Sequence, residues 1–277
     1  MDDVLLAELT SEVHSATEAK WILERAMTVD DASRIAPVAR AMAARRAGGE
    51  PLQYVLGSWS FRTLELLVDD RALIPRPETE QVVEAALERW RRTRPGDGAL
   101  SIVELGCGTG AICLSLISEL RAETRFGECV MTDVSSETLR LAGENALALG
   151  IGGLTLRVGN WFAALSEGLR GRVDLLIANP PYVSEGLRGH LDPVLDWEPD
   201  IALYAPMSRS GIAGFLHVET IVTQSREWLS PGGVLCLEMS EHHVQAAMEL
   251  ALRVGLVGVE EIRDLAGMPR GITAVAP

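Results

Sequence analysis

The chain has 277 residues, of which 47% are hydrophobic and 23% are charged. This composition excludes collagen, coiled coils and disordered chains, and the length favours one large α/β domain or a main domain with a smaller attachment. The 39 acidic against 25 basic side chains give a net charge of −14. A field of that sign repels phosphate backbones and disfavours naked nucleic acid as a partner.

The cysteines form no C-x-x-C pair, which predicts reduced thiols rather than a disulfide framework or a zinc knuckle; they are Cys107, Cys113, Cys129 and Cys236. The acidic N-terminus lacks the basic and apolar regions of a signal peptide, and no run reaches 18 apolar residues, so we expect a cytoplasmic protein without a membrane span. His242 and His243 face different directions on a helix, so the sequence predicts no metal site.

Residues 3–47 carry apolar residues at helical spacing, which predicts a short bundle of helices. After a Gly-Gly-Glu-Pro break, the stretch from Trp59 to Ile74 has β-forming residues on either side of Asp69-Asp70 and predicts a hairpin. We therefore expect a helical N-terminal domain over residues 1–57, a hairpin linker over 58–76 and the main domain over 77–277.

The run from Glu78 to Trp90 returns to helical spacing, with Pro77 suited to the first helical position and residues 94–98 ending the helix. Its basic residues predict a solvated face at the helix end, with a docking patch as the alternative; they are Arg89, Arg91, Arg92 and Arg94. At the start of this region, Arg76, Glu78 and Glu80 are interpreted either as an ion network or as a lid.

From Leu100 onward, short apolar runs alternate with helical segments. The predicted strands are Ser101–Leu105, Cys129–Asp133, Leu154–Val158, Val173–Ala178 and Val234–Glu238. This alternation predicts an α/β domain with a mostly parallel sheet covered by helices on both faces. Ligands bind such sheets beyond the carboxyl ends of the strands.

The first of these strands leads into a glycine-rich turn, with Gly106, Gly108 and Gly110 at alternate positions. Missing side chains let a nucleotide-like ligand approach the backbone. Glu104 precedes the turn, and Asp133 ends the next strand, where a carboxylate can accept hydrogen bonds from both ribose hydroxyls. The pattern fits a nucleoside-cofactor methyltransferase, but it also satisfies G-x-G-x-x-A, so a nicotinamide or flavin enzyme and a non-catalytic nucleotide-binding module stay open.

Asn179-Pro180-Pro181-Tyr182 follows an apolar strand and is expected at the mouth of the same cleft. The two prolines make a rigid loop that lacks two N–H donors. The Asn179 side chain and the Pro180 carbonyl can accept both hydrogens of a planar –NH2 group, on which the ring of Tyr182 can pack. Such a nitrogen is a weak nucleophile, so alignment of the reacting atoms is the expected source of catalysis.

These motifs resemble those of the peptide chain release factor N5-glutamine methyltransferases, the HemK or PrmC family. The resemblance spans nearly the whole chain and includes G-E-P-L-Q-Y-V-L-G at 49–57, I-P-R-P-E-T-E at 74–80, E-L-G-C-G-T-G-A at 104–111, N-P-P-Y, W-E-P at 197–199, and D-L-A-G at 264–267 with Arg270. It implies a Rossmann-like class I methyltransferase domain, and an N-terminal domain that helps to grip the release factor.

The resemblance also implies site residues. Asn179, Pro180 and Tyr182 would be catalytic, and with Pro181 they would form the glutamine pocket. S-adenosylmethionine would be the cofactor, held by Glu104, Gly106, Cys107, Gly108, Thr109, Gly110, Asp133, Asn160, Trp161 and Asn179. The implied substrate is the glutamine of a Gly-Gly-Gln loop in a class 1 release factor, without direct nucleic-acid contact.

The chain departs from the family pattern at three places. Asn160 stands where an Asp is usual, residues 205–211 differ from the expected G-G-x-D-G-like segment, and the N-terminal helical part is short. We expect the 205–211 loop to cover the substrate. The alternatives are a glutamine methyltransferase for a ribosomal or other protein and an adenine-N6 nucleic-acid methyltransferase, since the latter also uses N-P-P-Y on a planar amine.

Overall fold

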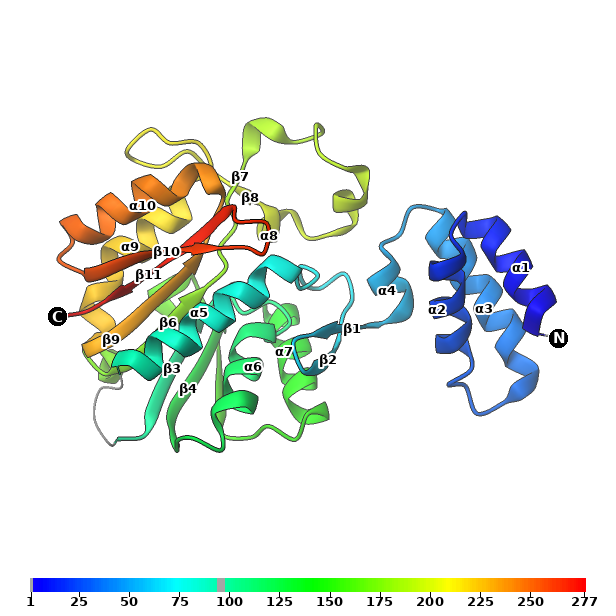
Figure 1. The fold of residues 1–277 in the computed structure, drawn as a ribbon, viewed down its shortest axis with the longest axis horizontal. Helices are drawn as coiled ribbons and strands as arrows, with labels where there is room; N and C mark the ends of the chain where they lie inside the picture. The colour runs from blue at the N-terminus through cyan, green and yellow to red at the C-terminus, as the bar shows by residue number, and fades with distance from the viewer. Residues whose placement is uncertain (1, 94–97) are drawn as a thin grey trace.

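The computed structural model describes residues 2–93 and 98–277. A group of N-terminal helices lies beside a larger α/β body, and a hairpin lies between them (Figure 1). The elements of this first part are α1 (Asp2–Val13), α2 (Ala16–Ala26), α3 (Ala32–Ala47), α4 (Leu52–Leu56), β1 (Ser58–Phe61) and β2 (Leu64–Leu67). The helical start predicted from the sequence is confirmed, and the short helix α4 is an addition to it.

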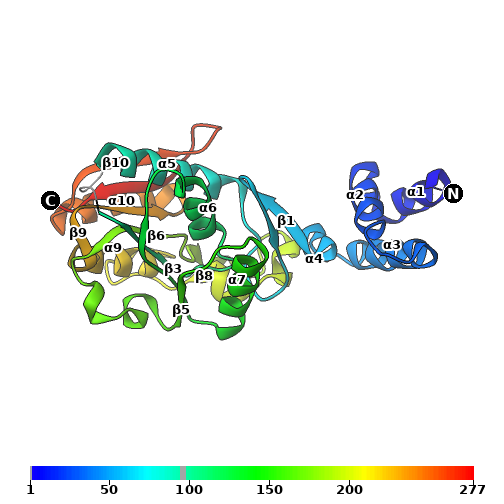
Figure 2. The same ribbon diagram turned by 90° about the horizontal axis from the view of Figure 1, so that it is seen from below.

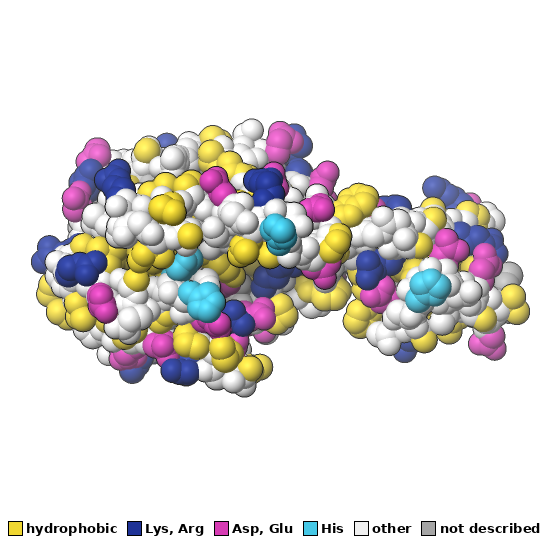
Figure 3. All heavy atoms as spheres, turned by 90° about the horizontal axis from the view of Figure 1, so that it is seen from above, with side chains coloured by type: hydrophobic (Ala, Val, Ile, Leu, Met, Phe, Trp, Pro, Cys, Tyr) yellow, Lys and Arg dark blue, Asp and Glu magenta, His cyan; other side chains and the backbone are white. Residues whose placement is uncertain are grey.

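The N-terminal helices have a hydrophobic core of their own, because their apolar stripes face one another. It includes Leu9 of α1, Ile22 of α2, Met42 of α3, and Leu52 and Val55 of α4. Figure 2 shows α1 to α3 standing away from the sheet, with α4 and β1 between them and the body. In the space-filling view, the two parts are joined at a narrow waist, and acidic and basic side chains are interspersed over both (Figure 3).

The hairpin forms, but its turn is not where the sequence predicted it. β1 and β2 pair antiparallel, with Phe61 opposite Leu64, so the turn lies at residues 62–63 rather than at Asp69-Asp70. Arg62 adopts a left-handed φ of 50°. Its guanidinium binds Glu84 and Glu119, and its backbone N–H donates to Glu80. These ionic contacts stabilise a turn conformation that the residue types alone do not favour.

A seven-stranded sheet forms the centre of the body, in the order β10-β11-β9-β6-β3-β4-β5. Its strands are β3 (Leu100–Leu105), β4 (Phe126–Asp133), β5 (Leu154–Val158), β6 (Val173–Ala178), β9 (Leu229–Glu238), β10 (Val257–Arg263) and β11 (Pro269–Val275). The pairs from β9 to β5 are parallel, and β11 is antiparallel to both of its neighbours. The mostly parallel α/β fold and the five predicted strands are confirmed, whereas β10 and β11 were missed.

Helices cover both faces of the sheet because the central strands are apolar on both sides. The helices are α5 (Pro77–Thr93), α6 (Ala111–Leu120), α7 (Ser136–Ala148), α9 (Leu216–Trp228) and α10 (Glu241–Arg253). Ile102 and Ile177 pack with α5, α6 and α7, whereas their neighbours Val103 and Leu176 pack with α9 and α10. No helix within residues 2–93 and 98–277 is long and apolar enough to cross a membrane.

The remaining elements are short and lie mostly at the carboxyl ends of the strands. They are β7 (Val183–Ser184), β8 (Tyr204–Ala205), α8 (Asp200–Leu203), η1 (Trp161–Ala164), η2 (Glu167–Leu169), η3 (Glu185–Leu187) and η4 (Pro193–Trp197). β7 and β8 pair in parallel and connect the loop after β6 to the loop before α9.

The basic cluster of α5 is paired, and the prediction of a solvated face is wrong for Arg89. Its side chain is buried, where it binds Glu260 and the carbonyl of Gly258 on β10. The exposed Arg91 pairs with Glu123, and Arg92 pairs with Glu260. Arg94 and residues 95–97 of the predicted helix end lie outside the described residues.

Candidate active site

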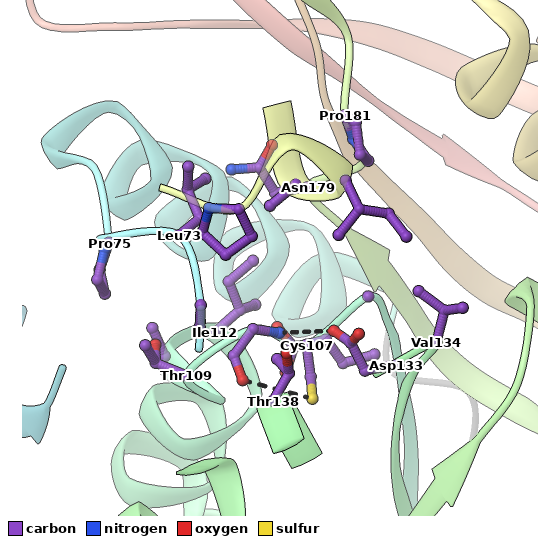
Figure 4. Close-up of a pocket in the computed structure, with 18 of the residues that line it drawn as sticks. Leu73, Pro75, Cys107, Thr109, Ile112, Asp133, Val134, Thr138, Asn179 and Pro181 are labelled. Carbon is purple, nitrogen blue, oxygen red and sulfur yellow. Dashed lines mark hydrogen bonds between the residues drawn. The ribbon is translucent and has the colours of Figure 1, made fainter. Parts of the chain in front are cut away.

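One cavity opens at the carboxyl ends of β3, β4 and β6, where the sequence placed the ligand site. Its wall combines the glycine turn, the end of β4, the start of the loop after β6 and the segment 71–76. Figure 4 shows Asn179 and Pro181 on one side of this cavity and Asp133 and Thr138 on the other, with Leu73 and Pro75 at its flank.

The glycine turn leaves space for a ligand against the backbone. Gly106, Gly108 and Gly110 have left-handed φ angles of 70°, 55° and 81°, which glycine adopts without strain. A Cβ atom at Gly106 would lie 3.2 Å from the Trp161 ring, whereas one at Gly108 would meet no atom within 4 Å. Gly108 is thus the point where the backbone is open to the cavity.

Two carboxyl groups flank the turn. Asp133 ends β4 and accepts hydrogen bonds from the backbone N–H groups of Gly108, at 3.2 Å, and Ser135, at 3.0 Å. Burial raises its pKa, although these hydrogen bonds oppose the shift. Its carboxylate keeps further lone pairs for a ligand's hydroxyls.

Glu104 lines the cavity, but one of its oxygens is directed to the protein. Its Oε2 accepts from the N–H of Cys113 in α6 at 3.0 Å, and burial raises its pKa to about 8. Burial therefore favours the protonated form of this carboxyl group. Cys107 and Thr109 also line the cavity between the glycines, and both are buried.

Asn160 and Trp161 form the cavity wall beyond β5. Trp161 has a left-handed φ of 46°, and its ring lies 5.3 Å from that of His217. Asn160 is exposed and makes no capping hydrogen bond with η1, so its side chain is available to a ligand. His217, from α9, was missed because nothing in the sequence separates it from an ordinary helix residue.

In the N-P-P-Y loop, Asn179 and Pro181 line the cavity, whereas Pro180 and Tyr182 do not. The Asn179 Nδ2 donates to Thr79 Oγ1 at 3.3 Å, and its Oδ1 accepts no hydrogen bond from the described residues. Pro180 is buried behind the wall. Tyr182 is half-buried, and burial raises its pKa. The structure therefore brings together the asparagine, the second proline and the glycine turn.

The segment 71–76 was not assigned to the site by sequence analysis. Tyr54 Oη donates to the Ala72 carbonyl at 2.7 Å, and Thr138 Oγ1 donates to that of Arg71 at 2.6 Å. Glu198, from the W-E-P motif, accepts from the Ile74 N–H. The sequence feature that could have indicated this segment is the I-P-R-P-E-T-E string. Its position beside the cavity depends on these long-range contacts, which the sequence does not show.

The contacts of Arg76, Glu78 and Glu80 show which of these residues belong to an ion network and which lie at the cavity. Arg76 forms an ion pair with Glu198 at 2.5 Å and also lines the cavity, so it takes part in an ion network and in the wall. Glu80 accepts from the N–H of Arg62 and stabilises the hairpin turn. Glu78 does not line the cavity.

The 205–211 segment does not line the cavity. The Ser208 hydroxyl accepts from the Ile212 N–H, and the N–H groups of Arg209 and Ser210 donate to Glu219 on α9. These contacts fold the loop onto α9. Residues 199, 201 and 202, just before it, border the cavity instead.

Within the described part of the chain, no three His, Cys, Asp or Glu side chains are grouped so that they could hold a metal ion. The described cysteines are all free and buried.

The fold and the cavity define a methyltransferase domain. A family model with that description, Methyltransferase domain, matches residues 97–250. Two solved structures share the fold. The first is the N-terminal domain of human METTL16 in complex with SAH, with a TM-score of 0.54 and 15% identity over 86% of this chain and 83% of that chain. The second is the T. thermophilus 16S rRNA methyltransferase RsmC in complex with AdoMet and guanosine, with a TM-score of 0.52 and 18% identity over 79% of this chain and 50% of that chain.

Curated relatives narrow the class. The protein named release factor glutamine methyltransferase in Cereibacter sphaeroides is 34% identical to this chain, over 95% of this chain and 92% of that protein. The protein of the same name in Agrobacterium fabrum is 31% identical, over 98% of this chain and 88% of that protein. The chain belongs to the family of release factor glutamine methyltransferases. The sequence-based identification of the family is confirmed, and the comparisons give no support to an oxidoreductase or a binding module.

Proposed function

We propose that this protein transfers a methyl group from S-adenosylmethionine to the side-chain amide nitrogen of the glutamine in the Gly-Gly-Gln loop of a class 1 release factor. The observation that carries the proposal is the Asn179 amide at the cavity wall, with Nδ2 bound to Thr79 and Oδ1 open to a partner. The names of the relatives support the same substrate. The proposed site of action is the cytoplasm.

The residues present fit the cofactor. The backbone at Gly108 is open, since a Cβ atom there would meet no atom within 4 Å, and Asp133 offers carboxylate oxygens for ribose hydroxyls. The half-buried Trp161 ring and the exposed Asn160 side chain would lie beside its adenosine part. When bound, S-adenosylmethionine supplies an electrophilic methyl group on a positively charged sulfur.

The N-P-P-Y loop would act by alignment. The Asn179 Oδ1 at the cavity wall accepts one hydrogen of the glutamine –NH2 group, and with Pro181 beside it fixes the plane of that group. Fixing the plane presents the nitrogen along the line of transfer. The loop would thus hold the amide nitrogen in line with the methyl group that the cofactor supplies, and the nitrogen would release one proton to solvent when it is methylated.

The N-terminal helices, residues 1–57, are proposed to dock the release factor, with the hairpin region 58–76 as a linker and 77–277 as the methyltransferase domain. Tyr54 of α4 reaches the cavity segment directly through the Ala72 carbonyl. A protein held on the helices would thus be close to the cavity wall.

The test is mass spectrometry of a purified release factor incubated with S-adenosylmethionine and the protein, beside an Asn179→Ala variant. We expect a methyl-sized gain on the Gly-Gly-Gln glutamine with the wild type and none with the variant, which should keep much of its affinity for S-adenosylhomocysteine because the glycine turn is unchanged. No gain by a wild-type protein that binds S-adenosylhomocysteine would overturn the substrate assignment. Full activity of Asn179→Ala would overturn the role of Asn179.

A further inference from the structure

Glu238 is a buried acidic side chain that the mechanism above does not use. It ends β9, which pairs in parallel with β6 so that Leu237 is opposite Ala178. The next residues in this register are Glu238 and Asn179, so the carboxyl group lies beside the N-P-P-Y loop. Its side chain is 1% exposed, and its Oε2 has no hydrogen-bond partner among the described residues. A buried acceptor without a partner is costly and points to a functional reason.

Three other elements face this carboxyl group. Thr79 and Glu78 approach from α5, Tyr182 from the N-P-P-Y loop and Arg270 from β11. Burial raises the pKa of Glu238 to about 7, with Glu78 acting in the same direction, while the Thr79 and Tyr182 hydroxyls and the Arg270 charge oppose the shift. On its own strand, the Cys236 thiol has a raised pKa, so it stays uncharged at neutral pH.

The Thr79 side chain faces Glu238 and is also hydrogen-bonded to Asn179. Its hydroxyl accepts from Asn179 Nδ2, and a hydroxyl has only one proton to donate. When Glu238 is ionised, it can only accept, so the Thr79 proton is directed to Glu238 and the Thr79 lone pair to Asn179 Nδ2. Asn179 then presents Oδ1, the acceptor that a substrate –NH2 group requires.

When Glu238 is protonated, the direction reverses. The carboxyl proton is donated to Thr79, and the Thr79 proton becomes available to Asn179 Oδ1. The amide then turns and presents its –NH2 group, which repels the –NH2 of a glutamine. The same set of atoms therefore has one arrangement that binds the substrate amide and one that does not.

We propose that Glu238, acting through the Thr79 hydroxyl, is a positioning residue that sets which end of the Asn179 side-chain amide faces the substrate. The proposal rests on the proposed function, because it takes the substrate group to be an amide –NH2. The Tyr182 hydroxyl also lowers the pKa of Glu238 and so favours its ionised form. The residue does not touch the reacting atoms.

The first experiment uses Thr79→Val, which removes the relay, and Thr79→Ser, which keeps the hydroxyl. For Thr79→Val we expect kcat with a Gly-Gly-Gln protein substrate to fall about 10- to 100-fold, as for one lost hydrogen bond near a charge, and the Kd of S-adenosylhomocysteine measured by calorimetry to change less than about threefold. Thr79→Ser should recover most of kcat. Wild-type kcat in a folded Thr79→Val protein would overturn the proposal.

The second experiment needs no methyl transfer. The side-chain amide signal of Asn179, identified by its loss in Asn179→Ala, is followed by ¹H–¹⁵N NMR as pH is varied. We expect it to titrate in the wild type and in Glu249→Gln, an exposed control on α10, but not in Glu238→Gln. A signal that does not titrate in the wild type would overturn the proposal even if methyl transfer is observed.

The proposed function and the role of Glu238 are tested by different outcomes. Absence of methyl transfer by the wild type would contradict the proposed function, while a titrating Asn179 signal that Glu238→Gln abolishes would still support the relay. In an active wild type, kcat should rise with pH as Glu238 ionises. Glu238→Gln should lose this rise, and an unchanged profile in that variant would count against the relay.

Discussion

The carboxylate of Glu198 accepts a hydrogen bond from the backbone N–H of Ile74, which precedes it by 124 residues. Its other oxygen binds the Arg76 guanidinium, and its side chain is only 1% exposed. A single buried acid in the W-E-P motif thus fixes two points of the segment that forms one wall of the cavity.

Replacing Glu198 by Ala should therefore loosen that wall. The buried Ile74 N–H loses its acceptor, so we expect the free energy of unfolding to fall by about 2 kcal/mol. Affinity for S-adenosylhomocysteine should fall about 10-fold, because the contacts of Glu198 hold the 71–76 wall in the conformation that binds the ligand. Denaturant unfolding and calorimetry measure the two effects. The exposed Asp196, replaced by Ala, is the control, and equal losses in both variants would contradict the prediction.

Asp133 should contribute to binding through hydrogen bonds to a ribose. We expect Asp133→Ala to raise the Kd of S-adenosylhomocysteine about 10- to 100-fold, as for a lost hydrogen bond to a charged group. The Kd of Asp133→Asn should lie between those of Asp133→Ala and the wild type, because asparagine keeps one acceptor oxygen. Calorimetry measures the three Kd values. Wild-type affinity in Asp133→Ala would show that the ribose lies elsewhere.

Glu104 should make the ligand-free protein less stable as pH rises. In the folded state its pKa is about 8, raised mainly by burial, whereas a glutamate in the unfolded chain ionises near 4.3. Between these values, the folded state keeps a proton that the unfolded state releases. The free energy of unfolding therefore falls with rising pH over this window.

Denaturant midpoints from about pH 5 to pH 8 test this, with Glu104→Gln expected to show a weaker decline. A residual decline should remain, because the raised pKa of Glu238 has the same sign of effect. Glu128→Gln, at an exposed position of β4, should keep the wild-type slope. A Glu104→Gln protein with that slope would indicate that Glu104 is already ionised at neutral pH.

The two arginines of α5 should differ in their effect on stability. Arg89 is buried against β10, so Arg89→Ala leaves a cavity and an unpaired Gly258 carbonyl, and we expect a loss of about 2–4 kcal/mol in the free energy of unfolding. The exposed pair of Arg91 with Glu123 should contribute about 0–1 kcal/mol. Chemical unfolding of both Ala variants gives the comparison, and a small effect at Arg89 would be unexpected.

The sequence predicts the parts of this molecule whose pattern is local. The glycine turn, Asp133 and Asn179 were placed at one sheet edge because parallel strands bring their carboxyl ends together. The hairpin turn at Arg62 and the wall at 71–76 could not be placed in this way. Both depend on contacts with acids far along the chain, Glu119 for the turn and Glu198 for the wall.

β10 and β11 were missed for a related reason. β10 reads V-G-V-E-E-I-R, in which a glycine and paired acids interrupt the strand alternation, and it is an edge strand with several exposed positions. β11 begins with Pro269 and reaches Gly271, where a Cβ atom would meet the Leu237 carbonyl. Glycine is required there by the close approach of the β9 backbone, which the sequence alone does not reveal.

The position of β11 also affects the order in which the protein can assemble. This strand is late in the sequence, yet it lies inside the sheet, between β9 and β10. During synthesis, one edge of β9 therefore stays unpaired until residues 269–275 have left the ribosome, and Glu238 lacks its β11 neighbours until then. The buried environment of that carboxyl group is thus completed only after β11 has been made, so a product truncated before residue 269 would carry a glycine turn and an N-P-P-Y loop without it.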